Sequence, residues 1–390
     1  MKCRFILDKK FRQGSLYKLT EWDQLGSYQK ELLVGLENEA DVYGLFEPVS
    51  DTSNLTFKVA YREVVMLYLH LQYNNKLPHY FIVSVNKNIT EILIRLILDE
   101  IIQIEGETGY VSGAAALPVL YGENIFEEHT VPGYLSALSF KAIYYAWMLH
   151  DADLTSITQK LYSFNTVPWD AFMKSRFYET HSIKEFLFSR VNETSRHMLD
   201  EQWQTYPNDE NKYWLSWSRH LPGQSLQERS HTCKLYISPQ INDLPEIFRR
   251  FIPIISASQA FSFKAGNSLQ GLLRPDKMVA YFYSKEALFY TAGLLREELG
   301  NYPSQGVPFT TQLDETGLLS YGEDPPVTEL LSSVDGGSWR TFITDQLALA
   351  IVQARKNKLN WQQTMGFIRA MLLTEGVDSY NWTTTKGLTK

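Results

Sequence analysis

The sequence predicts an α+β protein, with a helical, winged-helix-like N-terminal part followed by a smaller mixed α/β C-terminal domain. Two observations predict this. Between Tyr61 and Gly113, two apolar helical patterns precede a hairpin pattern. Between Phe261 and Phe282, two β-rich apolar runs flank a polar loop that contains glycine. Because 390 residues is long for one hydrophobic core, we expect three units: a winged-helix-like domain at 1–117, a helical region at 118–230 and an α/β domain at 231–390.

In the first unit, a dense apolar helix is expected at Tyr61 to Tyr73 and an amphipathic helix at Ile89 to Ile101. A turn at Gly106 to Gly109 then predicts the hairpin. The predicted buried stripe of the second helix comprises Ile92, Leu93, Leu96 and Ile97. Its predicted exposed face comprises Glu91, Arg95, Asp99 and Glu100. This mostly acidic face disfavours DNA, and leaves structural packing or peptide binding as the roles of the unit.

The middle of the chain is expected to be mostly helical from Leu135 to Trp217, after a linker at Ala115 to Val131. Asp153 or Thr155 is expected to cap a helix that ends near Asn165, and Ser182 to Trp203 reads as one helix. The polar stretch from Pro222 to Ser230 predicts a boundary.

After this boundary the pattern changes to short strands alternating with helices. Strands are expected at Lys234–Ser238, Ala260–Ala265 and Met278–Tyr283. Helices are expected at Asp243–Ile255, from Ser284 to Gly300, at Trp339–Lys356 and at Trp361–Thr374.

The composition narrows the functional classes. Hydrophobic residues make up 44% and charged residues 21%, which is ordinary globular usage. A net charge of −7 and the lack of a basic run argue against nucleic acid as a partner. The only two cysteines, Cys3 and Cys233, together with an N-terminus unlike a secretory signal, predict a cytoplasmic protein. No apolar stretch is long enough and free enough of charge to predict a membrane span.

Familiar catalytic and cofactor-binding motifs are missing, so no cofactor is expected. The eight histidines are scattered, and no two lie three or four residues apart, so no helix-borne metal site is expected.

The segment with the most chemical interest runs from Phe261 to Phe282. Antiparallel pairing of its strands would bring Lys264, Arg274 and Lys277 to one end of a hairpin, around backbone amides of the loop Gly266 to Gly271. Cations and free amides together form an anion site. The alternative is a set of solvated surface charges, in which Asp276 is an internal partner of Arg274 or Lys277 rather than a catalyst.

A resemblance is carried by short segments between Lys234 and Val352. In order, they are KLYIS, FSFKAG, RPDKMVAYF, GVPFT, LLSYGEDPP and SWRTFITDQLALAIV. They resemble HopA-type type III effectors and their relatives, the lyases of class V lanthipeptide pathways. Such lyases remove phosphate from phosphoserine or phosphothreonine in a ribosomal peptide and leave a dehydro residue. That chemistry needs a base, an acid and cations that hold the phosphate.

The resemblance implies roles for particular residues. Lys264 would be the base or a phosphate ligand, and His231 is a candidate acid. The implied substrate-binding residues are Lys234, Arg274, Asp276, Lys277, Tyr283, Thr310 and Arg340. The chain departs from its relatives in two places: Thr311 and Gln312 stand where relatives often carry lysine, and Ser338, Trp339 and Arg340 replace a Ser-Phe-Gly segment before the late arginine.

Three functions therefore remain open. The first is a lyase that acts on a phosphorylated peptide gripped by the N-terminal unit. The second is a non-catalytic protein that binds a peptide or a partner protein of a peptide-maturation system. The third is an effector that binds a host protein.

Overall fold

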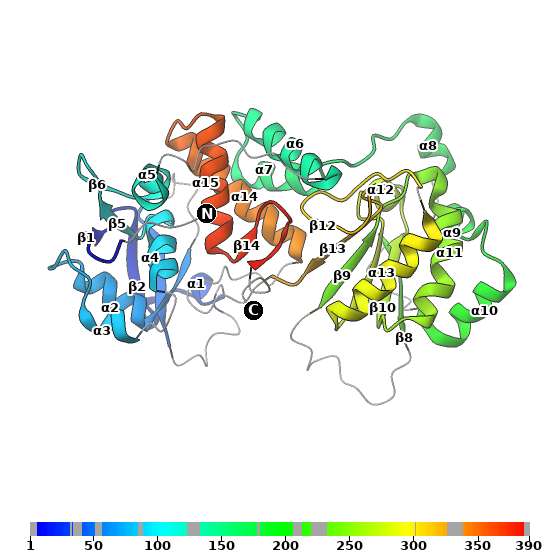
Figure 1. Ribbon diagram of the computed structural model, residues 1–390, viewed down its shortest axis with the longest axis horizontal. Helices are drawn as coiled ribbons and strands as arrows, with labels where there is room; N and C mark the ends of the chain where they lie inside the picture. Colours follow the sequence, from blue (N-terminus) through cyan, green and yellow to red (C-terminus); the bar gives the residue numbers. More distant parts are fainter. Residues whose placement is uncertain are drawn as a thin grey trace.

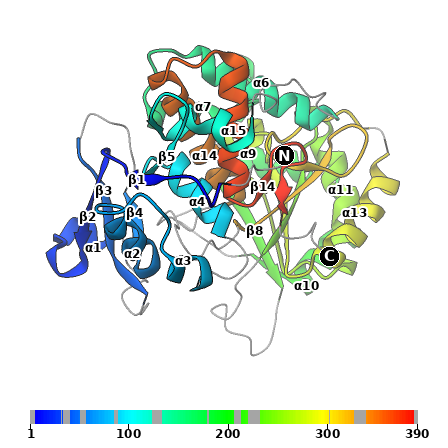
Figure 2. The ribbon, with the colours of Figure 1, turned by 60° about the vertical axis from the view of Figure 1, so that its left-hand side comes forward.

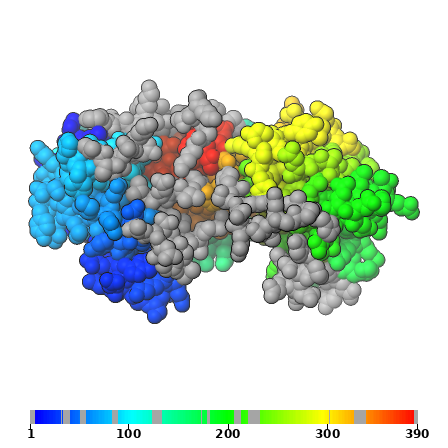
Figure 3. All heavy atoms as spheres, turned by 90° about the horizontal axis from the view of Figure 1, so that it is seen from below, coloured from blue at the N-terminus to red at the C-terminus, as the bar shows by residue number. Residues whose placement is uncertain are grey.

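The computed structural model describes residues 6–31, 33, 41–50, 57–84, 89–122, 133–177, 180–205, 213–219, 232–300, 302–325 and 338–385. They form the mixed α+β protein that the sequence predicts. The molecule is elongated, with the N-terminal elements at one end and a seven-stranded sheet at the other (Figure 1). Helices α14 (Trp339–Lys356) and α15 (Trp361–Thr374) lie between them. From below, N-terminal atoms and those of the sheet region occupy opposite ends (Figure 3).

The N-terminal elements contain the two predicted helices and the hairpin, with a short additional helix between the two helices. They are α2 (Arg62–His70), α3 (His79–Ser84), α4 (Ile89–Leu98), β5 (Ile102–Glu105) and β6 (Tyr110–Val111). Strand β1 (Phe11–Gln13) pairs with β5, and the predicted stripe of α4 is buried. A second sheet, at the edge of the molecule in Figure 2, comprises β2 (Tyr17–Glu21), β3 (Val42–Pro48) and β4 (Lys58–Tyr61). The 3-10 turn Trp22–Gln24 and helix α1 (Ser27–Glu31) follow β2.

The expected exposed face of α4 is wrong at three of its four residues. Arg95, Asp99 and Glu100 are buried. Nη2 of Arg95 lies 2.7 Å from Oε1 of Glu375, at the end of α15, and Nζ of Lys58 lies 2.9 Å from Oδ1 of Asp99. These ion pairs let α15 and β4 cover the charged side of α4.

The middle of the chain contains six described helices. They are α5 (Leu117–Tyr121), α6 (Tyr134–Met148), α7 (Leu154–Tyr162), α8 (Ala171–Arg176), α9 (Thr180–Phe188) and α10 (Glu193–Gln202). Asp153 caps α7, as one of the two predicted candidates. The single helix expected from Ser182 to Trp203 is wrong, because Asn192 caps a new helix by accepting a hydrogen bond from the backbone N–H of Ser195. The start of the expected linker forms α5. Its residues 123–131, and the expected boundary at 222–230, lie outside the described residues.

The large sheet is antiparallel throughout and has the order β12-β13-β9-β11-β10-β8-β7. Its strands are β7 (Trp203–Thr205), β8 (Trp214–Arg219), β9 (Cys233–Ile237), β10 (Ser262–Gly266), β11 (Met278–Phe282), β12 (Thr311–Gln312) and β13 (Leu319–Glu323). The predicted pairing of the two strands around Lys264 is confirmed, with Lys264 opposite Val279. Strands β7 and β8 were missed in the region expected to be helical. The stacking of Trp217 on Phe263, at 4.7 Å between ring centroids, shows the tertiary packing that selects the strand there.

The remaining elements complete the C-terminal half. They are the 3-10 turns Gly113–Ala116 and Ile241–Asp243, helices α11 (Leu244–Ala257), α12 (Leu269–Leu273) and α13 (Lys285–Leu299), and the hairpin of β14 (Val377–Asp378) and β15 (Thr383–Thr384). One large hydrophobic core joins the N-terminal elements to α14 and α15, and another lies between the seven-stranded sheet, α11 and α13. The three-unit division stays a prediction. None of the helices in the described ranges has the length and apolar character needed to cross a membrane.

Candidate functional site

The two faces of the seven-stranded sheet differ in chemistry, because alternate residues of a strand point to opposite faces. On one face, Phe263, Ala280 and Leu235 are buried in the core with α11 and α13. The opposite face, here called the polar face, carries Trp214, Lys234, Tyr236, Lys264 and Tyr281. Since these residues lie on four neighbouring strands, their side chains form one surface.

Two helices from elsewhere in the chain reach this surface. Helix α7 ends at Tyr162, and α14, which packs against α7, carries Arg340 in its first turn. Tyr236 lies within electrostatic range of both residues and of Asp276. The polar face is therefore completed by groups more than a hundred residues apart in the chain.

The carboxylate of Asp276 is the centre of the charged cluster. It accepts hydrogen bonds from Nε and Nη2 of Arg274, both 2.7 Å long. Nη1 of Arg340 lies 2.8 Å from the same carboxylate. Burial would raise the pKa of Asp276, but the positive charges of Arg340 and Arg274 outweigh it and hold that pKa far below its ordinary value. Asp276 is therefore ionised, and it fixes both guanidinium groups.

The two arginines differ in what they can reach. The side chain of Arg274 is 30% exposed, whereas that of Arg340 is 1% exposed. Arg340 donates through Nη2 to the backbone oxygen of Tyr162 at 2.6 Å, and its guanidinium lies 4.6 Å from the Tyr162 ring centroid. Arg274 can therefore contact a ligand, while Arg340 acts through Asp276.

Lys264 has an aromatic rather than an acidic setting. Its Nζ lies 4.3 Å from the ring centroid of Trp214 and 5.7 Å from that of Tyr281. Burial, with the nearby positive charges of Arg274 and Lys234, lowers the pKa of Lys264 to about 8, although Asp276 partly opposes this. A lysine of this kind is partly neutral near physiological pH and can accept a proton.

Lys234 forms the rim of the cluster. Its Nζ lies 2.9 Å from Oδ1 of Asp324, whose other carboxylate oxygen accepts from the side chain and backbone N–H of Thr232. The cluster therefore holds four cations, Lys234, Lys264, Arg274 and Arg340, against the two carboxylates of Asp276 and Asp324. This excess of positive charge favours an anionic ligand.

Three other residues predicted for the site make contacts with residues outside the charged cluster. Nζ of Lys277 is fully buried and donates to the backbone oxygen of Pro239 and to the side chain of Gln305. The hydroxyl of Thr310 is buried and donates to Val307 and Ser320. The ring of Tyr283 stacks on Phe261 at a centroid distance of 3.9 Å. His231 lies outside the described residues.

Three of the six loop amides between Gly266 and Gly271 that were expected to be free for an anion are bonded within the protein. The N–H groups of Gly266 and Asn267 donate to the backbone oxygens of Lys277 and Tyr213. The N–H of Gly271 donates to Oγ of Ser268, because part of the loop forms α12. The charged groups of the cluster itself are side-chain cations.

Sequence reasoning missed three members of the site: Tyr162, Trp214 and Tyr281. Tyr281 lies on a predicted strand, and its alternation with buried Ala280 and Phe282 could have placed it on the face of Lys264. Tyr162 and Trp214 could not be placed in this way, because only the tertiary fold brings them to this face.

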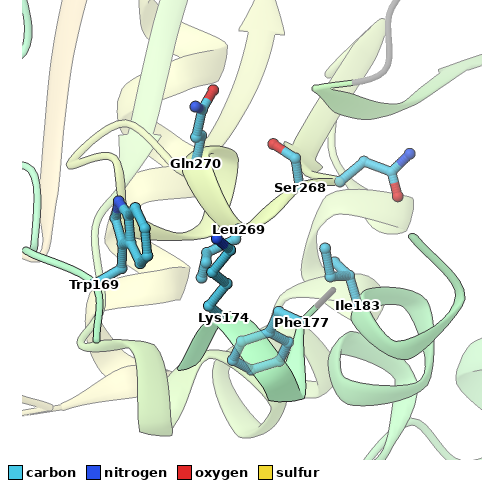
Figure 4. Close-up of a pocket in the computed structure, with 8 residues that line it drawn as sticks. Trp169, Lys174, Phe177, Ile183, Ser268, Leu269 and Gln270 are labelled. Carbon is cyan, nitrogen blue, oxygen red and sulfur yellow. The ribbon is translucent and has the colours of Figure 1, made fainter. Parts of the chain in front are cut away.

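A cavity of about 320 Å³ lies beside the loop that joins Lys264 to Arg274, at residues 267–270. Figure 4 shows Trp169 at the left, Lys174 and Leu269 together near the centre, Gln270 above them and Ser268 to the right. The buried apolar side chains of Phe177 and Ile183 also line the cavity. The charged cluster on the polar face does not line this cavity. Among the described residues, no three His, Cys, Asp or Glu side chains gather as metal ligands would.

No protein-family model matches the chain, and no curated protein matches it significantly. Two similar solved structures are effector proteins. The effector from Pseudomonas syringae pv. tomato strain DC3000 is 12% identical, with a TM-score of 0.39, over 64% of this chain and 99% of that one. The effector from Pseudomonas syringae pv. syringae strain 61 is 13% identical, with the same TM-score and coverage. What the site can do follows from its own residues.

Proposed function

We propose that the polar face binds a phosphorylated serine or threonine of a peptide and eliminates its phosphate, leaving a dehydro residue. The observation that carries the proposal is the pairing of a potential base with a phosphate-binding cation on one surface. Lys264 has a pKa lowered to about 8, and the partly exposed guanidinium of Arg274 lies within its electrostatic range.

In the proposed reaction, the neutral amine of Lys264 takes the α-proton of the phosphorylated residue. The electron pair of that C–H bond forms the Cα–Cβ double bond, and the Cβ–O bond breaks with its electron pair on the departing phosphate. Arg274 and Lys234 hold the phosphate through charge-assisted hydrogen bonds. Asp276 orients Arg274, and Arg340 holds Asp276 in place.

A second candidate is a phosphopeptide-binding protein without catalysis, either in a peptide-maturation system or as an effector that binds a host protein. The two hydrogen bonds from Arg274 to Asp276 favour this second candidate. Because of them, a bound phosphate shares the guanidinium of Arg274 with a carboxylate and gains less stabilisation from it as a leaving group. Both candidates use the same surface and the same class of ligand, so they differ only in whether phosphate is released.

The test is incubation of the full chain with synthetic phosphoserine and phosphothreonine peptides, followed by mass spectrometry for loss of phosphoric acid. Lys264→Ala and Arg274→Ala should abolish elimination while thermal unfolding stays cooperative. The matched control is Lys285→Ala, because Lys285 also lies over an aromatic ring, at 5.1 Å from the Tyr321 centroid, but belongs to α13 on the other side of the sheet.

Each outcome decides between the candidates. Elimination that Lys285→Ala retains and Lys264→Ala loses supports the lyase. Binding of the phosphopeptide without any release of phosphate by the wild-type protein refutes the lyase and leaves the binding protein. Equal affinity for phosphorylated and unphosphorylated peptide refutes both.

A further inference from the structure

Elimination of phosphate needs an acid as well as a base, because the departing oxygen becomes strongly basic as the Cβ–O bond breaks. The described histidines do not supply it. His70, His79, His181 and His197 lie on α2, α3, α9 and α10, and His150 follows α6 beside Trp147. Within the described part of the chain, the polar face also carries the ammonium of Lys234, which is paired with Asp324, and the hydroxyl groups of serines such as Ser262 and of tyrosines. A tyrosine hydroxyl is ordinarily a stronger acid than a serine hydroxyl.

Tyr281 has the best position among these tyrosines. On β11 it is directly opposite Lys234 of β9 and Ser262 of β10, so it points to the polar face. Its ring centroid lies 5.7 Å from Nζ of Lys264. It is also within electrostatic range of Asp276, Asp324 and Arg274. The ring thus lies near the proposed base, and on the sheet it lies directly opposite Lys234, one of the proposed phosphate-binding cations.

The hydroxyl groups of the three tyrosines in the cluster have different surroundings. That of Tyr162 accepts a hydrogen bond of 2.9 Å from Nη2 of Arg274. Tyr236 is 3% exposed, too little for contact with a peptide. Tyr281 is partly exposed, and its hydroxyl forms no hydrogen bond with any residue that the structure describes. It can therefore turn toward a bound phosphate ester.

We propose that Tyr281 is the general acid of the site and donates its hydroxyl proton to the bridging oxygen of the departing phosphate. This inference rests on the proposed function. The α-proton ends on Lys264, the tyrosine proton ends on the phosphate, and transfer of a proton from the Lys264 ammonium to the tyrosinate, directly or through solvent, restores both groups. No oxidant or further reactant is needed.

The electrostatics of the site keep this hydroxyl protonated. Burial, with the negative charges of Asp276 and Asp324, raises the pKa of Tyr281 well above its ordinary value, so the hydroxyl keeps its proton across the working pH range. The proton is then transferred only when negative charge develops on the departing oxygen, within reach of Arg274 and Lys234.

The test compares wild type with Tyr281→Phe, which keeps the ring and removes only the hydroxyl. Single-turnover elimination from a phosphoserine peptide should slow by about 10²–10⁴-fold. The Kd of the peptide, measured by fluorescence anisotropy with the unlabelled peptide as competitor, should stay within about threefold, since the arginine and lysine contacts remain. The matched control is Tyr321→Phe, which removes a hydroxyl bonded to Thr383 from the other side of the sheet and should leave the rate unchanged.

The solvent isotope effect on the elimination rate shows whether Tyr281 donates a proton or has only a structural role. The α-proton of the substrate is bound to carbon and does not exchange during one turnover, whereas the tyrosine proton exchanges freely with the solvent. Elimination by wild type should therefore slow in D₂O, and the residual elimination by Tyr281→Phe should lose this effect.

A Tyr281→Phe rate equal to wild type, or a slower rate that keeps the full isotope effect, would overturn the inference while leaving the lyase intact. A wild-type protein that never releases phosphate overturns the proposed function, and this inference with it.

Discussion

Arg274 and Asp276 are two residues apart in the chain and share two hydrogen bonds of 2.7 Å. Such a bidentate pair fixes the plane of the guanidinium as well as its position. The two partners differ in exposure, because Asp276 is buried and its Oδ2 also lies 2.8 Å from Nη1 of Arg340, whereas the side chain of Arg274 is 30% exposed. The geometry therefore makes Asp276 the anchor of the site and Arg274 the group presented to a ligand.

Asp276→Asn should destabilise the fold by about 3–5 kcal/mol near neutral pH, because it leaves two guanidinium groups without their buried counter-charge. The free energy of unfolding in urea measures this. Asp324→Asn is the matched control at the more exposed rim and should cost about 1 kcal/mol or less. A smaller effect at Asp276 than at Asp324 would show that Asp276 is not the anchor.

The same substitution has a predicted pH dependence. The pKa of Asp276 is depressed in the folded protein, so its contribution to stability is present above the unfolded-state value of about 3.9 and is lost as the pH falls below it. The free-energy difference between wild type and Asp276→Asn should therefore shrink below about pH 4. A difference that stays constant into the acid range would contradict the ionised, paired carboxylate.

The pH profile of elimination should report Lys264. Since only the neutral amine accepts the α-proton and its pKa is about 8, kcat/KM should rise about tenfold per pH unit below that value and level off above it. Lys234→Gln should move the rising limb to higher pH, because the positive charge of Lys234 helps to lower the pKa of Lys264. Lys285→Gln should leave the limb in place. A profile that is flat between pH 6 and 9 would exclude Lys264 as the base.

Local patterns predicted much of the fold and part of the site. The β10–β11 pair, the buried stripe of α4 and the helices α13, α14 and α15 each follow from periodicity or capping within a short segment. The placement of Lys264 and Arg274 near each other follows from the same hairpin. These features depend on residues that are close in the chain, which sequence patterns describe well.

The rest depends on contacts between distant segments. Tyr162 contacts Arg274 across 112 residues, and its backbone oxygen contacts Arg340 across 178. The strand β8 is set by packing of Trp217 on Phe263 and Phe248, with no alternation strong enough to mark it. Arg95 and Asp99 are charged residues whose burial depends on partners in β4 and α15. No short segment encodes these partners, so their roles could not be predicted.

Leu96→Ala should destabilise the protein by about 2–5 kcal/mol, because Leu96 is fully buried in the stripe of α4 and its truncation leaves a cavity. Thermal or urea unfolding measures this. Tyr73→Ala, at a side chain that is 82% exposed, is the control and should change stability by less than about 0.5 kcal/mol. Equal, small effects at both positions would mean that the stripe does not form core.

Lys277 should make the stability of the protein depend on pH above neutrality. Its amine is fully buried and donates to two acceptors, Pro239 and Gln305, which a neutral amine with two N–H groups can satisfy. Burial lowers the pKa of Lys277 to about 7, against about 10.4 in the unfolded chain. Between these values the unfolded chain binds more protons than the folded protein, so stability rises with pH.

Lys277→Met removes that proton-binding difference, so the stability gained by wild type over the variant should increase from pH 7 to pH 10 and level off beyond. Urea unfolding at several pH values measures the two curves. Lys285→Met is the matched control: the pKa of Lys285 is raised, so its contribution is constant below about pH 10 and the variant should run parallel to wild type. If the Lys277→Met curve also runs parallel, the amine is charged in the folded protein, and its two acceptors hold an ammonium group.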